Sequence, residues 1–260
     1  MGGGDRALPR GAPDRARLGR VAPEPRGRAR PGGPARGGGR APARGRAPAR
    51  RALSYTGPAV ILVTGFEPFG GHTLNPSEGL AKAVDGRRVG AHAVQGLVLP
   101  VHHAEAWAAL APVLEATAPA AVVHLGLAAG RARVGLERVA LNVMDYEVAD
   151  NAGFRAAGEP CVPGGPAAYL ATLPLDELRR ALTAEGIPAY VSNSAGTYLC
   201  NQTLYRTLHA VRELARPPRV GFVHFPLLPA MVAASGLEQP SMDFPLMLRA
   251  VEVILAVLAR

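Results

Sequence analysis

Residues 192–224 read SNSAGTYLCNQTLYRTLHAVRELARPPRVGFVH, and this stretch carries the clearest signals of the fold class. A turn of small residues opens it and leads into a segment of helical period, Tyr198–Leu214. A short apolar run, Val220–His224, follows and is typical of a buried strand. A turn, a helix and a buried strand in this order form one unit of an α/β domain with a mostly parallel sheet.

The same alternation continues along the chain from Pro58 onward. Further strands are predicted at residues 59–64, 91–99, 120–125 and 138–143. Further helices are predicted at residues 76–84, 103–115, 175–185 and 241–258. Residues 144–165 interrupt the alternation with an irregular segment rich in Gly and Pro, and long loops of this kind are commonly functional.

The first 52 residues differ in composition from the remainder. They are almost entirely Arg, Gly, Pro and Ala, with a net charge of +11, whereas the remainder has a net charge of −2. A segment with so few apolar side chains cannot offset the entropy lost on ordering. We therefore expect residues 1–54 to be a disordered basic tail and residues 55–260 to be the folded domain.

The basic tail allows three interpretations. An Arg-rich arm can bind RNA, DNA or anionic membranes by releasing counterions. No Phe or Tyr lies among its arginines to stack on bases, so we do not expect a nucleic-acid partner. A third hypothesis is that translation starts downstream, in which case the tail is upstream GC-rich sequence.

Several classes of protein are disfavoured by what the sequence lacks. No apolar leader and no span of about 18 uncharged apolar residues occurs, so we expect a soluble cytoplasmic protein without membrane contact. Two cysteines, Cys161 and Cys200, are too few for a disulfide framework, and no Cys/His spacing of a zinc site is present. The absence of GxSxG and HExxH disfavours a serine hydrolase or a zinc peptidase, so no metal is expected.

Cys200 lies in the first turn of the helix predicted at residues 198–214. A thiol at this position feels the positive end of the helix dipole and unpaired backbone N–H groups, which lower its pKa and favour the thiolate. The same N–H groups can hold an oxyanion. A single Cys in an apolar helix is nevertheless more often a core residue, so Cys200 alone does not establish a nucleophile.

His224 ends a predicted strand, at the sheet edge where open α/β sheets place their sites. The order strand, Cys200 helix, strand and His224 would bring the carboxyl ends of two neighbouring strands together. We therefore predict that Cys200 and His224 lie within hydrogen-bond reach. A histidine that only packs in the core or at a sheet edge is the commoner case in isolation.

Two carboxylates compete for the role of orienting this imidazole. Glu137 stands at the start of the strand predicted at residues 138–143, and Asp150 lies in the irregular segment. A carboxylate beside a histidine sets its tautomer and stabilises its cation. The simpler interpretation of Glu137 is a surface ion pair with a nearby arginine.

The segment Thr64–Gly71 follows the first predicted strand and is rich in Gly. It has neither the Lys-Ser/Thr ending of a P-loop nor GxGxxG, so it does not predict a phosphate site. Its two aromatic residues, Phe66 and Phe69, predict an apolar wall instead.

In their order and their residues these segments resemble the pyroglutamyl peptidase I family, also called pyrrolidone-carboxylate peptidases. The resemblance runs from about Val60 to near the C-terminus. Its blocks are TGFEPF (64–69), NPS (75–77), LERVALN (136–142), DNAG (150–153), GPAAY (165–169), GIP (186–188), SAGTYLCN (194–201) and GFVHFP (221–226). Any one block is a modest signal, but the ordered set is highly specific.

The resemblance implies a three-layer α/β/α sandwich around a mixed, mostly parallel twisted sheet. It implies a cysteine exopeptidase that acts on pyroglutamyl peptides in the cytoplasm without a cofactor, as a homo-oligomer that is often a tetramer. The catalytic residues of the family fall on Cys200, His224 and Glu137.

The resemblance also implies a pocket for the pyroglutamyl ring. Its aromatic positions fall on Phe66, Phe69 and Tyr198. Leu127 belongs to the same pocket and stands where many members carry Gln, which is a departure from the family pattern. Tyr198 stands where bacterial members often have Phe and keeps the aromatic face.

Three other functions stay open at this point. The first is a non-enzymatic binder that keeps the fold and the pocket. The second is a nucleic-acid protein that acts through the basic tail. The third is a different thiol hydrolase, such as an amidase on glutamine, which uses the same Cys and His but has no evident need for the aromatic pair.

Overall fold

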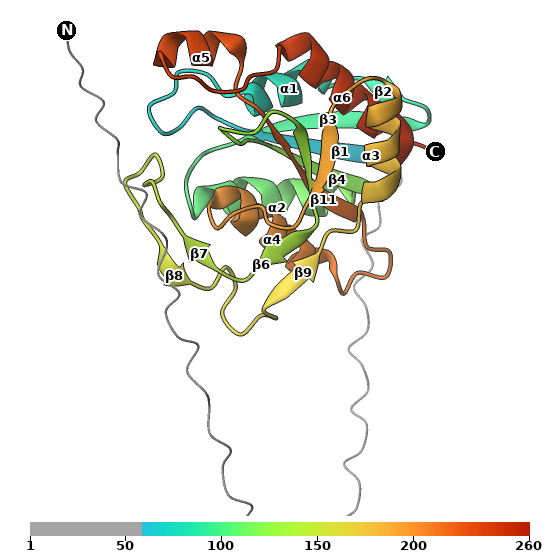
Figure 1. Cartoon of the computed structure of the whole chain (residues 1–260). Coiled ribbons are helices and arrows are strands. Elements are labelled where there is room, and N and C mark those ends of the chain that lie inside the picture. Colours follow the sequence, from blue (N-terminus) through green and yellow to red (C-terminus); the bar gives the residue numbers. More distant parts are fainter. Residues whose placement is uncertain (1–58) are drawn as a thin grey trace, which may run out of the picture. The chain divides into compact units, whose positions relative to one another are not determined.

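A computed structural model describes residues 59–260 of the chain (Figure 1). The expected disordered tail, and the domain boundary proposed at residue 55, lie outside these residues. Within residues 59–260, every helix is too short or too polar to cross a membrane.

A seven-stranded mixed sheet forms the centre of the described region. Its strands are β1 (Val60–Phe66), β2 (Arg88–Val89), β3 (His92–Leu99), β4 (Ala121–Leu127), β5 (Val134–Glu137), β10 (Ala189–Ser192) and β11 (Arg219–Phe225). Their order across the sheet is β10-β5-β11-β4-β1-β3-β2. Four neighbouring pairs are parallel, and the pairs β5·β11 and β2·β3 are antiparallel.

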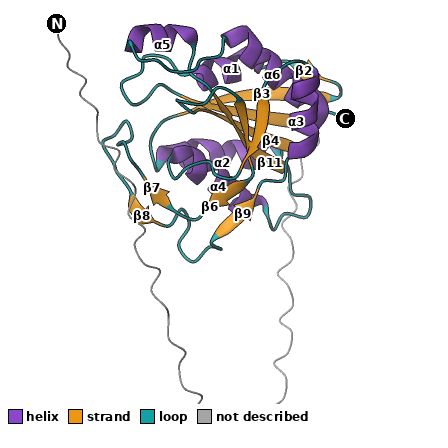
Figure 2. Cartoon of the chain, in the orientation of Figure 1, coloured by secondary structure: helices purple, strands orange, loops and turns teal. Residues whose placement is uncertain are grey.

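Helices cover both faces of this sheet (Figures 1 and 2). One face packs against α1 (Pro76–Val84), α3 (Leu175–Ala184) and α6 (Phe244–Leu258). The other face packs against α2 (Glu105–Thr117) and α4 (Leu199–Val211). The short helix α5 (Pro229–Ser235) contributes to a separate small cluster. The expected three-layer α/β/α sandwich is confirmed.

The central strand β11 shows how the sequence places a polar group in an apolar layer. Val223 and Phe225 point to the α1/α3/α6 face, and Val220 and Phe222 point to the α2/α4 face. Both faces are covered, so the strand is apolar almost throughout. His224 alternates with its neighbours and therefore lies on the α2/α4 face.

A strand does lie within the range predicted at residues 138–143, but it does not belong to the main sheet. The sheet strand is β5, which ends at Glu137, whereas β6 (Val139–Leu141) pairs with β9 (Ala168–Leu170) in a separate two-stranded sheet. Exposed Arg138 lies between them, where the chain leaves the main sheet. Glu137 thus ends a buried strand instead of preceding one.

The irregular segment contains a second two-stranded sheet. β7 (Met144–Asp145) pairs antiparallel with β8 (Ala157–Glu159), and residues 146–156 connect them. These strands are short and largely exposed, which is why period-2 patterning did not reveal them.

The topology predicted around Cys200 and His224 is also wrong. β10 and β11 are not neighbours, because β5 lies between them and runs antiparallel to β11. The carboxyl ends of β10 and β11 therefore point to opposite edges of the sheet. Residues 193–198 instead lead the chain from β10 to the start of α4, on the face that also carries His224.

Candidate active site

Glu137 and His224 form a buried hydrogen-bonded pair across the antiparallel strands β5 and β11. The Nδ1 atom of His224 lies 2.8 Å from Oε1 of Glu137, and Glu137 is fully buried. A carboxylate only accepts hydrogen bonds, so Nδ1 carries the proton in this pair. The other ring nitrogen of His224, Nε2, is then left with a lone pair.

The electrostatics of the pair favour an ionised carboxylate and a neutral imidazole. Burial opposes ionisation of Glu137, but the hydrogen bond from His224, with help from Ser192 and Arg131, outweighs it and lowers the pKa of the carboxyl. Burial lowers the pKa of His224, and the bond to Glu137 only partly offsets this. The imidazole is thus a free base at neutral pH.

Cys200 lies on the same face of the sheet as this pair. A β-carbon on Gly126 would be 3.1 Å from the Cys200 sulfur, so the sulfur packs against β4 at that residue. Gly126 is the direct neighbour of His224 across the β4·β11 pair. Directly opposed residues of paired strands point to the same face, so the thiol and the imidazole share one side of the sheet.

The Cys200 thiol does not have the lowered pKa that its position in the helix alone predicted. Burial raises the pKa of the Cys200 thiol to about 12, and the Glu137 charge adds to the rise, while Arg131 opposes it. The residue as a whole is partly exposed, but its sulfur is packed against the sheet. Burial therefore outweighs the lowering effect of the backbone N–H group of Cys200, which lies in the first turn of α4.

A small apolar pocket opens beside the sulfur. Its lining includes the four residues expected from the sequence, Phe66, Phe69, Leu127 and Tyr198, together with Asn75, Val101, Leu199 and Cys200. Asn75 was not identified as a pocket residue, although it caps α1 by accepting from the Ser77 N–H at 3.1 Å. Its place in the block NPS was the available signal.

The aromatic walls of the pocket pack on one another. The rings of Phe69 and Tyr198 are stacked with centroids 5.6 Å apart, and Tyr146 meets Tyr198 edge-on at 4.6 Å. The Tyr198 hydroxyl donates to the Ala149 carbonyl at 3.2 Å. Tyr198 is thereby held between the pocket and the segment that connects β7 and β8.

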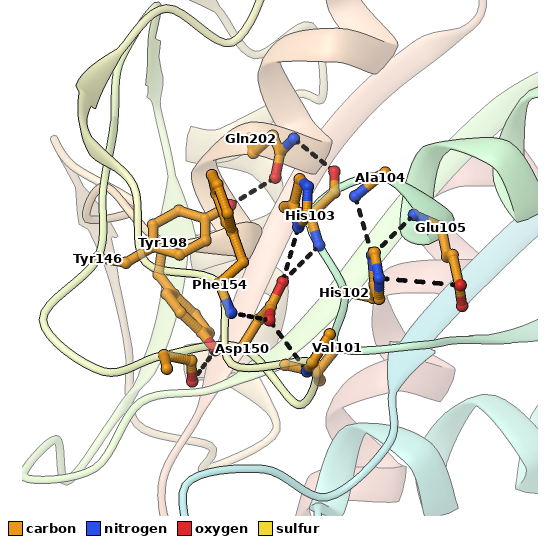
Figure 3. Close-up of polar contacts among 12 residues, drawn as sticks. Val101, His102, His103, Ala104, Glu105, Tyr146, Asp150, Phe154, Tyr198 and Gln202 are labelled. Atoms are coloured by element: carbon orange, nitrogen blue, oxygen red, sulfur yellow. Dashed lines mark hydrogen bonds and ion pairs between the residues drawn. The ribbon is translucent and has the colours of Figure 1, made fainter.

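Asp150 lies in this connecting segment and pairs with His103, not with His224 (Figure 3). Its Oδ2 atom accepts from the backbone N–H and from Nδ1 of His103, both at 2.9 Å. Its Oδ1 atom accepts from the N–H groups of Ala152 and Phe154. These bonds overcome the effect of burial and lower the pKa of Asp150. The Asp150 carboxylate therefore stabilises the segment that connects β7 and β8, which also accepts the hydrogen bond from Tyr198.

The same region holds the one group of residues, within 59–260, whose side chains lie close enough to share a metal ion: His102, His103 and Asp150. Their lone pairs are mostly used already. Both oxygens of Asp150 each accept two hydrogen bonds, and Nδ1 of His102 faces the N–H groups of Ala104 and Glu105 (Figure 3). An ion would have to break this network, so the donor set does not fit a metal.

Comparison with known proteins identifies the family. The sequence model of the pyroglutamyl peptidase family matches residues 59–260. The chain belongs to this family. Pyroglutamyl peptidases are cysteine peptidases, so both the family and the enzyme class expected from the sequence blocks are confirmed.

Relatives within the pyroglutamyl peptidase family are similar over nearly their whole length. The pyrrolidone-carboxylate peptidase of Pyrococcus furiosus is 44% identical over 200 residues, which cover 76% of this chain and 96% of the relative. The pyrrolidone-carboxylate peptidase of Klebsiella pneumoniae is 43% identical over 202 residues, covering 78% and 94%.

Solved structures of pyroglutamyl peptidases share the fold. A crystal structure of the pyrrolidone carboxyl peptidase of Pyrococcus furiosus superimposes with a TM-score of 0.75 at 43% identity. The match covers 76% of this chain and 97% of that chain.

Proposed function

We propose that this protein removes an N-terminal pyroglutamyl residue from peptides, with Cys200 as nucleophile, His224 as acid and base, and Glu137 as the carboxylate that orients His224. The observation that carries this proposal is the buried Glu137–His224 pair on the same sheet face as Cys200, beside an apolar pocket that the thiol itself lines.

The first half of the reaction is acyl transfer to sulfur. Because the thiol is protonated and the imidazole is a free base, Nε2 of His224 takes the thiol proton as the sulfur attacks the pyroglutamyl carbonyl. The backbone N–H groups in the first turn of α4 have no partner within the helix and can stabilise the oxyanion. His224 then gives the proton to the departing amine, and a thioester remains.

The second half is hydrolysis of that thioester. Nε2 of His224 removes a proton from water as the water attacks the acyl carbon, and the proton returns to sulfur when the thiol leaves. Glu137 remains ionised throughout and stabilises the imidazolium that forms in each half.

The pocket selects for a substrate end that carries no charge. The lactam ring of pyroglutamate has no ammonium group, so it suits a slot lined by Phe66, Phe69 and Leu127. A free N-terminal Glu or Gln would bring a charged amine into this slot and would pay a desolvation cost. Specificity follows from this exclusion.

The remaining expectations are part of the same proposal. The domain spans residues 55–260, the enzyme works in the cytoplasm without a cofactor, and it forms a homo-oligomer, with a tetramer implied by the resemblance to the family. Sedimentation of the purified protein distinguishes a tetramer from a monomer.

The test compares pyroglutamyl, prolyl and glutaminyl anilides as substrates. We expect turnover of the pyroglutamyl anilide alone, and loss of that turnover in Cys200→Ala. Cys161→Ala is the matched control, because Cys161 is the chain's other cysteine and faces the Leu141 and Val143 carbonyls. Unchanged turnover in Cys200→Ala would falsify the nucleophile assignment, and binding without turnover by the wild type would favour a non-enzymatic binder.

A further inference from the structure

Arg131 shares one oxygen atom of Glu137 with His224. Its Nη1 atom lies 2.7 Å from Oε1 of Glu137, the same atom that accepts from His224 at 2.8 Å. The Arg131 side chain is 29% exposed, whereas the carboxylate is fully buried. The guanidinium therefore reaches the pair from the solvent side.

The second oxygen of this carboxylate has no well-formed hydrogen bond within residues 59–260. Oε2 of Glu137 is buried and accepts no hydrogen bond from residues 59–260, although the Ser192 hydroxyl lies close enough to lower the pKa of the carboxyl. Both firm hydrogen bonds thus converge on Oε1. The orientation of the carboxylate, and through it that of the imidazole, depends on the two donors that meet there.

The backbone makes room for this arrangement at Gly135. A β-carbon there would lie 3.0 Å from Nη1 of Arg131 and 3.5 Å from Oε1 of Glu137. Gly135 is also the direct neighbour of His224 across the β5·β11 pair. Because residue 135 has no side chain, β5 leaves room for the guanidinium to approach the carboxylate.

The charges within the group balance. Arg131 is positive, Glu137 is negative, and His224 and Cys200 are neutral in the resting site. Without the guanidinium, the buried carboxylate would have only the imidazole to neutralise it. The cheapest way to pair the charge would then be to protonate His224, which removes the base.

We propose that Arg131 is a positioning residue, which anchors Oε1 of Glu137 and keeps His224 unprotonated so that it can accept the Cys200 proton. This inference rests on the proposed function, because it assigns a task to His224 in that reaction. Arg131 touches neither the sulfur nor the pocket lining among the described contacts, so it acts through Glu137.

The direction of the expected pH effect follows from the groups that face His224. Glu137 on β5 raises the pKa of His224, and Arg131 in the β4–β5 connection lowers it. Cys200 on α4 is neutral at the pH values concerned, because its pKa is about 12. Removing the guanidinium removes a lowering influence, so the acid limb of the activity profile moves to higher pH.

The experiment compares Arg131→Gln, Arg131→Lys and the control Arg133→Gln. Arg133 lies two residues along the chain and stacks 4.6 Å over the Tyr190 ring, so its loss changes the net charge equally without touching Glu137. In Arg131→Gln we expect kcat/KM to fall on the order of tenfold to a hundredfold near pH 7, since small errors in positioning cost about that much. We expect partial rescue in Arg131→Lys and a wild-type profile in Arg133→Gln.

A second measurement separates this inference from the proposed function. The rate at which iodoacetamide alkylates Cys200, measured against pH in a Cys161→Ala background, reports the Cys200 and His224 ionisation without any substrate. We expect its acid limb to move to higher pH in Arg131→Gln only. An unmoved limb in both measurements overturns the role of Arg131, whereas a moved alkylation limb in a protein that cleaves no pyroglutamyl anilide overturns the proposed function alone.

Discussion

The Cys200 sulfur occupies space that exists because residue 126 is glycine. A β-carbon on Gly126 would lie 3.1 Å from that sulfur and 2.7 Å from the Phe222 ring. Since Phe222 is fully buried, the ring has little room to move. The contact with the ring is the more severe of the two, and this ring packs on the His224 ring with centroids 4.6 Å apart, so an added β-carbon would press on His224 as well as on the sulfur.

We therefore expect Gly126→Ala to displace the Phe222 ring, to disturb the His224 ring and the thiol that pack beside it, and to lower kcat by about a hundredfold, because a misplacement of about 1 Å has such an effect. Gly221→Ala is the matched control. Its β-carbon would meet the Leu173 side chain at 2.5 Å, which is a comparable clash in the layer on the other face of the sheet. Equal losses of kcat for the folded forms of both variants would contradict the special role of Gly126.

Glu137 and Asp150 are both buried carboxylates beside a histidine, but their partners predict different phenotypes. Glu137→Gln should lower kcat by roughly a hundredfold or more, because it removes the charge that stabilises the imidazolium. Asp150→Asn should instead lower the free energy of unfolding by about 1–3 kcal/mol, because a carboxylate oxygen that accepts two N–H groups is replaced by a donor.

The two variants are compared by urea unfolding and by the pH profile of kcat/KM. We expect Asp150→Asn to keep the acid limb of the wild type, since Asp150 contacts His103 and not His224. A displaced acid limb in Asp150→Asn, with an unchanged one in Glu137→Gln, would reverse the two assignments.

The wall of the pocket gives a prediction for substrate binding. Tyr198→Phe keeps the ring that stacks on Phe69 and removes only the bond to the Ala149 carbonyl, so we expect KM within about threefold of the wild type. Tyr198→Leu removes the flat face, and we expect KM to rise about tenfold or more with a smaller change in kcat. A larger effect from Tyr198→Phe than from Tyr198→Leu would show that the hydroxyl matters more than the ring.

Local signals in the sequence were sufficient for five of the six helices within residues 59–260, and the short helix α5 was not predicted. The helix predicted at residues 76–84 is found at Pro76–Val84, because Pro76 in its first turn and the cap that the structure shows at Asn75 act within a few neighbouring residues. Five of the eight residues that line the pocket were also identified from the sequence, whereas Asn75, Val101 and Leu199 were not.

Features that depend on distant strands were not predictable in this way. The strand predicted at residues 138–143 begins where the chain leaves the main sheet, and only the pairing of β5 between β10 and β11 shows that the strand of the main sheet ends at Glu137. The pKa of the Cys200 thiol depends on burial against β4, which helix position alone does not report. The two interpretations of Glu137 were posed as alternatives, yet one oxygen atom makes both contacts.

A second buried histidine predicts how stability changes with pH. His124 is fully buried between Thr64 Oγ1 at 2.8 Å and Thr207 Oγ1 at 3.1 Å. Burial lowers the pKa of His124 from 6.5 to about 3. Between these pH values the unfolded chain binds a proton that the folded protein excludes, so stability falls as pH decreases, by up to about 1.4 kcal/mol per pH unit for this residue.

The test is urea unfolding of wild type and His124→Gln at several pH values from 7 to 4. The lowered pKa of His224 also makes the protein less stable as pH falls. The lowered pKa values of Glu137 and Asp150 reduce stability only at pH values below the ordinary pKa of a carboxyl group. We expect His124→Gln to be less stable at pH 7 but to lose stability less steeply. His72→Gln, at a half-buried position before α1, is the matched histidine control. Equal slopes for wild type and His124→Gln would mean that His124 accepts a proton in the folded state.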